Sequence, residues 1–445
     1  MKQRSGILYK ALSLWIRIGL RVYFSKISIK GFHHIPKTGA VMLVANHQNA
    51  LLDALVVAVH IARPIYFITR ADVFNRPLIA RFLASINMLP IYRQRDNVDT
   101  IALNKPIFEK TAEILHQQGA ILIFPEGNQA RVRNLRPLQK GFARMGFGAA
   151  ALSEFENDIQ LVPIGINYSH HTEARGTLFV QAGQPISFKD FYPFYLENQQ
   201  KGLKDISTQI SPLIQSLIIH IPNSDHHQTI DFLRTFYRPV QMQRHKLTHD
   251  LTSQHEQEQK IADALENHRQ VSPNEFHLLS EKVDLFHTLN QKVKISPEIL
   301  SKPPLTLLSF CTLGLMLLLL MPIALFGMFN HLPAVLLVKY IVRNKVKDQN
   351  FLASIKFLGS MVVFTLFYII QSILVGLLSG NWWIALLYLI LLPVSGGVYL
   401  FCQNQVKNLL QQWTYRQLLS DPNNKLMVLY RDIVARMGRM VVNGC

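Results

Sequence analysis

The sequence predicts an α/β protein in which a mixed sheet flanked by helices is followed by a helical accessory region and a C-terminal transmembrane helical block. Three observations predict this order. Short apolar runs alternate with helical patterns from about residue 27 to 190, a polar helix-forming stretch fills 223–302, and long apolar stretches occupy 303–403. Alternating strands and helices are typical of a parallel or mixed sheet, and apolar stretches of about 20 residues are typical of membrane spans.

The charge of the chain points to an anionic surface as its partner. The 445 residues carry a formal net charge of +18, and eight Lys and Arg residues precede Asp53, the first acidic residue. Such a surface suits nucleic acid or an anionic bilayer. Because the chain has apolar C-terminal stretches and no zinc-finger spacing or RNA-binding aromatic signature, we expect membrane lipids and no nucleic acid as partners. The sequence does not predict an oligomeric state.

The cysteines give no sign of a disulfide framework or of a metal site. There are three of them: Cys311, Cys402 and Cys445. Two lie inside apolar stretches and their spacing matches no metal-ligand pattern, so we expect no metal and a reducing cytoplasmic setting.

Residues 1–26 predict an interfacial amphipathic helix. Lys10, Arg17 and Arg21 interrupt its apolar run and fall within about 40° of one another on a helical wheel. A basic stripe on an apolar helix suits the headgroup plane of an anionic leaflet. The alternative is an amphipathic helix packed on the domain core. The interruptions, and the lack of a small-residue cleavage site, argue against a cleavable signal.

Residues 27–222 predict the α/β domain. Its candidate strands are six short apolar runs, at 27–29, 41–45, 65–69, 120–124, 161–166 and 178–182. Its candidate helices show helical periodicity, at 50–61, 76–85, 100–118, 139–153 and 205–220.

Residues 223–302 predict a solvated helical accessory region. They are polar and contain eight histidines, including His245 and His249 at a one-turn spacing. No further ligand follows in a recognised zinc pattern, so we do not expect a metal there.

Two membrane spans are predicted at 357–379 and 382–402, joined by the uncharged turn Gly380–Asn381. Lys and Arg residues flank both outer ends, so the positive-inside rule places these ends in the cytoplasm and the turn outside. Residues 404–445 are then a cytoplasmic tail.

The apolar block 305–342, interrupted by Pro322, must then start and finish on one side of the membrane. Either it re-enters the membrane, or 305–321 and 323–342 form a short hairpin. The sequence does not choose between these arrangements.

A polar turn between the strand at 41–45 and the helix at 50–61 carries the first candidate catalytic residues. It presents His47 and, six positions on, Asp53. A strand-to-helix turn aims an imidazole rigidly, and a nearby carboxylate fixes its tautomer and stabilises its charged form. This pattern predicts a general base with its orienting acid.

A second motif, Ile121–Gly127, ends a buried strand with Glu126 and Gly127. Glycine permits a sharp turn, and ligands of open α/β sheets bind beyond the carboxyl ends of strands. Five basic residues follow within twenty positions: Arg131, Arg133, Arg136, Lys140 and Arg144. Arginine binds phosphate through paired hydrogen bonds, so we expect a phosphate near this turn or, alternatively, a basic surface facing lipid headgroups.

Two further strand-like runs complete the set, Leu89–Arg95 and Val162–Ile166. The first contains Arg93 just beyond its apolar part. The second contains Pro163, which lacks a ladder donor and therefore belongs at an edge, a bulge or a strand start.

Taken in their order along the chain, these four motifs resemble those of the glycerolipid acyltransferase family, the lysophosphatidate and glycerol-3-phosphate acyltransferases. The matching residues are Asn46, His47 and Asp53; Pro90 to Arg93; Phe124, Pro125, Glu126 and Gly127; and Val162 to Ile164. The resemblance covers residues 27 to about 220 and implies a glycerophosphate acyltransferase-like fold.

Two positions depart from the family pattern. Five residues separate His47 from Asp53, where four are usual, and Asn128 stands where Thr or Ser commonly follows. One extra residue would rotate the carboxylate by about 100° on a continuous helix, but a turn with Asn49 as N-cap absorbs it. The five-residue gap resembles a subgroup that includes fungal glycerol-3-phosphate/dihydroxyacetone phosphate acyltransferases with apolar C-terminal segments.

The residue types also fit acyl transfer by themselves. A glycerol hydroxyl needs a base, for which His47 is suited, and a thioester releases a thiol of pKa about 8.5 as thiolate without much acid help. Direct transfer then needs no Ser or Cys nucleophile, and no motif supplies one.

The resemblance implies a membrane-bound O-acyltransferase of phospholipid biosynthesis or remodelling. It would move an acyl group from acyl-CoA or acyl carrier protein, as co-substrate and without a cofactor, to glycerol-3-phosphate or a lysophospholipid. Substrate-binding roles are implied for Arg93, Glu126, Gly127, Arg131 and Lys140, and supporting roles for Asn46, Phe124, Pro125 and Pro163.

Other interpretations remain open. They are an acyltransferase for a non-phosphate lipid, an inactive membrane-anchored lipid-binding protein and a lipid hydrolase, the last disfavoured because no Gly-x-Ser-x-Gly elbow occurs. We expect an integral protein of a bacterial inner membrane with its catalytic domain on the cytoplasmic face.

Overall fold

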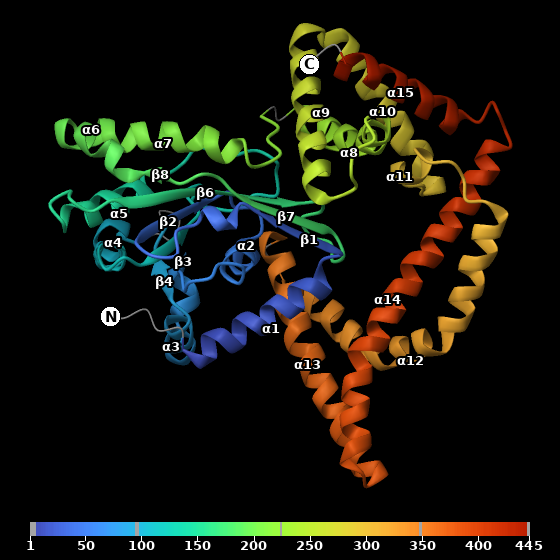
Figure 1. Ribbon diagram of the computed structural model, residues 1–445, viewed down its shortest axis with the longest axis horizontal. Coiled ribbons are helices and arrows are strands. Elements are labelled where there is room, and N and C mark those ends of the chain that lie inside the picture. Colours follow the sequence, from blue (N-terminus) through green and yellow to red (C-terminus); the bar gives the residue numbers. More distant parts are fainter. Residues whose placement is uncertain (1–5, 94–97, 223–224, 347–348, 443–445) are drawn as a thin grey trace. The chain divides into compact units, whose positions relative to one another are not determined.

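The structure is a computed structural model that describes residues 6–93, 98–222, 225–346 and 349–442. The chain forms two compact units. The first comprises Met1–Pro222 and Asp348–Phe357, and the second comprises Asn223–Lys347 and Leu358–Cys445. The sheet lies in the first unit, and helices make up the second (Figure 1).

The first unit contains an eight-stranded mixed sheet. Its strands are β1 (Lys26–Lys30), β2 (Ala40–Ala45), β3 (Tyr66–Arg70), β4 (Met88–Ile91), β5 (Ala120–Ile123), β6 (Ile159–Tyr168), β7 (Thr177–Ala182) and β8 (Ile186–Ser187). Their order is β1-β7-β6-β2-β5-β3-β4, with β8 beside β6. All pairs are parallel except those of β6 with β7 and β8. The predicted mixed sheet and the six predicted strands are confirmed, whereas β8 was not predicted.

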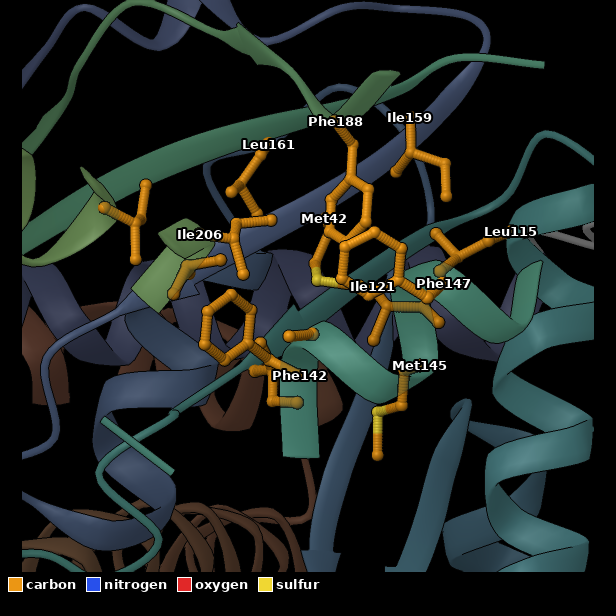
Figure 2. Close-up of a cluster of buried hydrophobic side chains, with 14 of the residues drawn as sticks. Met42, Leu115, Ile121, Phe142, Met145, Phe147, Ile159, Leu161, Phe188 and Ile206 are labelled. Carbon is orange, nitrogen blue, oxygen red and sulfur yellow. The ribbon is translucent and has the colours of Figure 1, made fainter. Parts of the chain in front are cut away.

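Helices cover the sheet and bury its apolar side chains. They are α1 (Ile7–Tyr23), α2 (Ala50–Ala58), α3 (Pro77–Ser85), α4 (Thr100–His116), α5 (Gly141–Ala151), α6 (Tyr192–Glu197) and α7 (Gln199–Gln215). Figure 2 shows the core on one face, where Met42 of β2 and Ile121 of β5 pack with Phe142 of α5 and Ile206 of α7. Every residue of β2 is buried, which explains its unbroken apolar run. Because β2, β5, β3 and β4 pair in parallel, their carboxyl ends share one edge of the sheet.

Helix α1 presents two different faces. Leu20 and Tyr23 are buried, and the Arg17 guanidinium donates to the Val59 carbonyl just after α2. Leu14 and Ile18, in contrast, are more than half exposed. The helix therefore packs on the domain with one side and leaves an apolar side uncovered.

The second unit begins with a helical bundle, in agreement with the predicted accessory helices. Its helices are α8 (His227–Arg244), α9 (Leu251–Val271), α10 (Pro273–Val293), α11 (Pro297–Leu300) and α15 (Lys425–Val442). Arg234 is almost fully buried and forms ion pairs with Asp231 and Glu258. A buried charge is tolerated only when it is paired in this way.

Residues 404–442 are mostly helical and pack on the bundle, and the cytoplasmic location expected for 404–445 stays a prediction. Helix α14 continues to Leu419, and α15 buries Ile433 and Met437 completely. Asp432 of α15 also forms an ion pair of 2.6 Å with Lys282 of α10. The amphipathic pattern of α15 supplies the apolar face that the bundle covers.

Within the described residues, three helices are long and apolar enough to cross a membrane: α12 (Leu307–Lys345), α13 (Leu352–Ser379) and α14 (Trp382–Leu419). The two predicted spans lie within α13 and α14. Between them Gly380 has a φ of 65°, a conformation that glycine adopts without strain.

Helix α12 continues through Pro322, so of the two arrangements left open the structure favours re-entry over a hairpin of two separate helices. The helix bends instead (Figure 1). Near its start, Leu305 contacts Gln412 and Arg416 of α14. Near its end, Val338 packs with Val363 of α13. Helices α13 and α14 meet at the turn Gly380–Asn381, and both contacts lie at the ends of these helices that are away from this turn. The start and the end of α12 therefore lie on the same side, as a re-entrant segment requires.

The bend is held by polar side chains. Gly327 approaches the Ser395 backbone so closely that a Cβ would lie 2.3 Å from its oxygen. Tyr388 donates to Asn330 Oδ1 at 2.5 Å, and Gln371 donates to the Asn330 carbonyl at 2.9 Å. These bonds join all three helices at one level, where prolines on either side weaken the regular hydrogen bonding of α12.

Candidate active site

The turn between β2 and α2 is fastened to its neighbour strand before it reaches the histidine. Asn46 is 2% exposed. Its amide nitrogen donates to the Ile166 carbonyl at 3.0 Å, and its amide oxygen accepts from the Ile166 N–H at 2.7 Å. This paired contact with β6 fixes the backbone from which the next side chain projects.

His47 and Asp53 form the predicted pair. His47 Nδ1 lies 2.9 Å from Asp53 Oδ2, and the His47 side chain is 14% exposed whereas Asp53 is fully buried. A carboxylate only accepts, so Nδ1 carries the hydrogen and Nε2 keeps the lone pair that a general base needs. The ring also stacks on Phe124 with centroids 4.2 Å apart, which limits its rotation.

Asp53 is held from three more directions. The backbone N–H groups of Gln48 and Asn49 each donate to Oδ2 at 2.7 Å. The Tyr168 hydroxyl donates to Oδ1 at 2.7 Å. Burial, followed by the Asp53 charge, raises the pKa of Tyr168 well above its ordinary value, so this hydroxyl remains a donor. The carboxylate therefore has little freedom to leave His47.

The extra residue between His47 and Asp53 is absorbed by the turn, as expected. Asn49 is the N-cap of α2, although its side chain makes no capping bond, and Asp53 lies in the first helical turn. Ala50 has a φ of 41°, in the left-handed region that side chains rarely adopt. This strained residue turns the chain so that the carboxylate still faces the histidine.

Glu126 joins the second motif to the first. It is buried, and its Oε1 accepts from the His47 N–H at 2.6 Å. Its Oε2 accepts from Arg136 Nε at 2.8 Å. Gly127 follows with a φ of 73°, which confirms the predicted need for glycine. The observed partners of Glu126 are protein groups, so its contact with an acceptor hydroxyl stays a prediction.

The basic candidates lie in different places. Arg131 follows Ala130, whose N–H donates to the His47 carbonyl, so it stands beside the catalytic turn. Arg93 follows β4, the strand at the end of the parallel set. The Lys140 ammonium donates to Gln200 of α7 at 3.2 Å and is exposed. Roles for all three remain predictions.

Pro163 contradicts its sequence prediction, because it lies inside β6, which has partners on both sides. It pairs with Val44 of β2, while its carbonyl accepts from Gly183 on the other side. In a strand the N–H and C=O of one residue point the same way, so the missing donor faces the interval between β7 and β8. No ladder bond is required there.

Two functional residues were not selected from the sequence. Tyr168 ends β6 at the strand terminus nearest Asp53, and Arg136 was one of five similar basic residues. The signal available for Tyr168 was that a residue with a hydroxyl lies two positions beyond the fourth motif, Val162–Ile166. Nothing local distinguished Arg136 from its neighbours.

The sheet edge with its His–Asp pair defines a domain of the acyltransferase class. Residues 26–167 match the family model described as Acyltransferase. Over these residues the chain is similar to glycerol-3-phosphate O-acyltransferases.

The relatives match over part of their length. Glycerol-3-phosphate O-acyltransferase 2 of Saccharomyces cerevisiae is 27% identical over 140 residues, which are 31% of this chain and 19% of the relative. Glycerol-3-phosphate O-acyltransferase 1 of the same yeast is 28% identical over 134 residues, 29% of this chain and 18% of the relative. The matches thus span about a fifth of these relatives. Among solved structures, the 1-acyl-sn-glycerophosphate (LPA) acyltransferase PlsC of Thermotoga maritima has a TM-score of 0.35 and 15% identity, covering 47% of this chain and 79% of that one.

Proposed function

We propose that this protein is a membrane-bound O-acyltransferase that moves a fatty acyl group from acyl-CoA or acyl carrier protein to glycerol-3-phosphate or a lysophospholipid. The observation that carries the proposal is the His47–Asp53 pair, with the ring 2.9 Å from a fully buried carboxylate. The two yeast relatives are glycerol-3-phosphate O-acyltransferases, which supports glycerol-3-phosphate as acceptor. The chain would act in phospholipid synthesis or remodelling.

The chemistry follows from the free Nε2 lone pair of His47. This nitrogen takes the proton of the acceptor hydroxyl as the oxygen attacks the thioester carbonyl. The tetrahedral intermediate then collapses, the carbon–sulfur bond breaks, and the thiolate leaves and regains a proton from the imidazolium. Asp53 stabilises the imidazolium while it exists. Arg93, with Arg131 or Lys140, would hold the acceptor phosphate.

Exposed apolar side chains support a membrane setting. In α1, Leu14 and Ile18 are more than half exposed, and in α3 Leu78 and Phe82 are 80% and 47% exposed. Apolar surface of this kind next to basic residues suits an anionic leaflet. We place the catalytic domain on the cytoplasmic face of a bacterial inner membrane. A reporter fused after Cys445 should be cytoplasmic, and an external reporter would refute this orientation.

Acyl transfer by the purified full chain in vesicles tests the proposal. Labelled acyl-CoA and acyl carrier protein are offered with glycerol-3-phosphate, lysophosphatidate and an amino-acid lipid that lacks phosphate. We expect transfer to a phosphate acceptor, lowered on the order of 10³-fold by His47→Ala. Transfer to the amino-acid lipid alone would favour the non-phosphate alternative. Lipid binding without transfer to any acceptor would favour an inactive binding protein, and transfer undiminished by His47→Ala would refute the base.

A further inference from the structure

The segment that leads into α13, the second of the three candidate membrane-crossing helices in the described residues, lies on the edge of the sheet that carries His47. Residues Asp348–Phe357 belong to the first compact unit although they directly precede the membrane part of α13. The Arg131 guanidinium donates to Gln349 Oε1 at 2.8 Å. Lys356 Nζ donates to the Thr172 carbonyl at 2.9 Å, beyond the end of β6. The segment therefore runs along the loops that follow β5 and β6, past the turn that carries His47.

Ser354 is the residue of this segment that contacts the catalytic turn. It is 3% exposed, and its hydroxyl donates to the Asn49 carbonyl at 2.9 Å. The same oxygen accepts from the Leu52 N–H at 3.0 Å. The Leu52 N–H also donates to the Asn49 carbonyl at 2.9 Å, so Ser354 bridges two groups that already bond to each other. Because Asn49 supplies no side-chain cap, Ser354 acts as an additional cap from outside α2.

The position of this cap matters because the turn is strained and sets the positions of His47 and Asp53. Ala50, with its φ of 41°, lies between the two backbone groups that Ser354 bridges. A residue with a side chain is strained in this region and persists there only where its surroundings hold it. The Asn49 N–H, on the same residue as the bridged carbonyl, donates to Asp53 at 2.7 Å. Loosening the bridge would therefore loosen the carboxylate that orients His47.

We propose that Ser354 is a positioning residue for the His47–Asp53 pair and that the first turn of α13 is a structural part of the active site. This inference rests on the proposed acyl transfer and goes beyond it, since it assigns a catalytic task to the C-terminal block. Ser354 lies one helical turn, about 5 Å, before the apolar side chains that follow Phe357.

Three variants of the full chain test the assignment. Ser354→Ala removes the bridge, Ser354→Thr keeps the hydroxyl, and Ser372→Ala is the matched control. Ser372 lies in the same helix and is 7% exposed, and its Oγ has no hydrogen-bond partner within the described part of the chain. All three are compared with wild type for kcat, for KM of the acyl donor, and for melting temperature in the same detergent.

We expect Ser354→Ala to lower kcat about tenfold, to leave the donor KM within about twofold, and to be rescued to within about threefold of wild type by Ser354→Thr. Ser372→Ala should match wild type. Equal kcat for Ser354→Ala and Ser372→Ala would overturn the assignment. So would a loss in Ser354→Ala that is confined to the melting temperature.

Amide hydrogen exchange separates failure of this inference from failure of the proposed function. We expect the amides of residues 48–53 to exchange at least about tenfold faster in Ser354→Ala than in Ser372→Ala, because the bridge holds the start of α2. This result does not depend on finding an acceptor. Faster exchange in a chain that transfers no acyl group would uphold the positioning contact and refute the acyltransferase. Unchanged exchange would refute the positioning contact even in an active enzyme.

Discussion

His47 and His331 are both largely enclosed histidines whose rings are held by hydrogen bonds, but their partners differ in chemical kind. His47 meets the carboxylate of Asp53, stacks on Phe124, and keeps 14% of its side chain exposed. His331, inside α12, meets the Gly327 carbonyl at 2.5 Å and the Tyr368 hydroxyl at 2.7 Å. Both rings are fixed in orientation. One faces an anion and solvent, and the other faces two neutral groups.

The difference teaches how a catalytic histidine is distinguished from a structural one. A carboxylate stabilises the charged ring that exists for an instant during proton transfer, and exposure admits the substrate. A carbonyl and a phenol satisfy the hydrogen-bonding groups of a ring and hold it in place. Between residues 305 and 402 the sequence has one acidic residue, Asp348, and it lies outside the apolar stretches. His331 is therefore placed to fasten a bend, and His47 is placed to act as the proposed base.

The largest loss of activity is expected from Asp53→Asn, which gives His47 a neutral partner like those of His331. Asparagine presents an N–H₂ group where Asp53 accepts from the ring, from two backbone N–H groups and from Tyr168. We expect kcat to fall on the order of 10³-fold, because the ring loses both its tautomer preference and its counter-charge. The double variant with His47→Ala should be no worse than His47→Ala alone. A loss smaller than tenfold would contradict the role of Asp53.

Glu126→Gln is expected to act next most strongly, by about 100-fold on kcat/KM. Glu126 accepts with both oxygens, from the His47 N–H and from Arg136. A glutamine places an N–H₂ group against one of these donors and leaves the Arg136 charge, whose side chain is 22% exposed, without its partner. Steady-state kinetics measures the loss. Arg136→Lys, which keeps the charge, serves as the control and should lose less. Equal losses would assign the effect to the guanidinium geometry instead.

These two predictions rest on residues that the sequence itself indicated, and the reason is local. β2 and β5 are buried on both faces, so their apolar runs stand out, and the residues that follow them must lie at the sheet edge. The pair His47 and Asp53 is six positions apart and needs one turn of chain to meet. The family resemblance then indicated that the four motifs belong to one site.

Contacts between distant parts of the sequence were beyond the reach of such reasoning. Tyr168 and Asp53 are 115 positions apart, and Ser354 and Asn49 are 305 apart. No periodicity marks either partner, because each depends on how the strands and loops assemble. Pro163 was misjudged for the same reason, since its tolerance depends on where β7 and β8 stop pairing with β6. The bend of α12 likewise depends on Tyr388 and Gln371 from other helices.

Tyr168→Phe sharpens the comparison by removing one hydrogen bond to Asp53 while the ring keeps its packing. We expect kcat to fall about tenfold, which corresponds to about 1.4 kcal/mol, a value typical of a hydrogen bond to a charged group. The pKa of Tyr168 is raised well above its ordinary value, so the hydroxyl stays protonated and the loss should be the same at every pH of the activity profile. Tyr192→Phe is the matched control, because it removes a buried hydroxyl that donates to the Asn157 carbonyl away from the site. A loss in Tyr168→Phe that disappears in part of the pH range would contradict this account.

The smallest effect on catalysis is expected from His331→Leu. This variant tests the comparison through its effect on stability. The variant leaves the Tyr368 hydroxyl without the ring nitrogen that lies 2.7 Å away, and it removes one of the bonds that hold the bend of α12. We expect unfolding in detergent to become easier by about 1 kcal/mol, while kcat stays within about twofold of wild type. Phe329→Leu, at a neighbouring side chain that is 64% exposed, is the control for an apolar change in the same turn. If His331→Leu instead abolished transfer at unchanged stability, the two histidines would be equivalent in function. The neutral partners of His331 would then be sufficient for proton transfer, and the distinction drawn from the Asp53 carboxylate would fail.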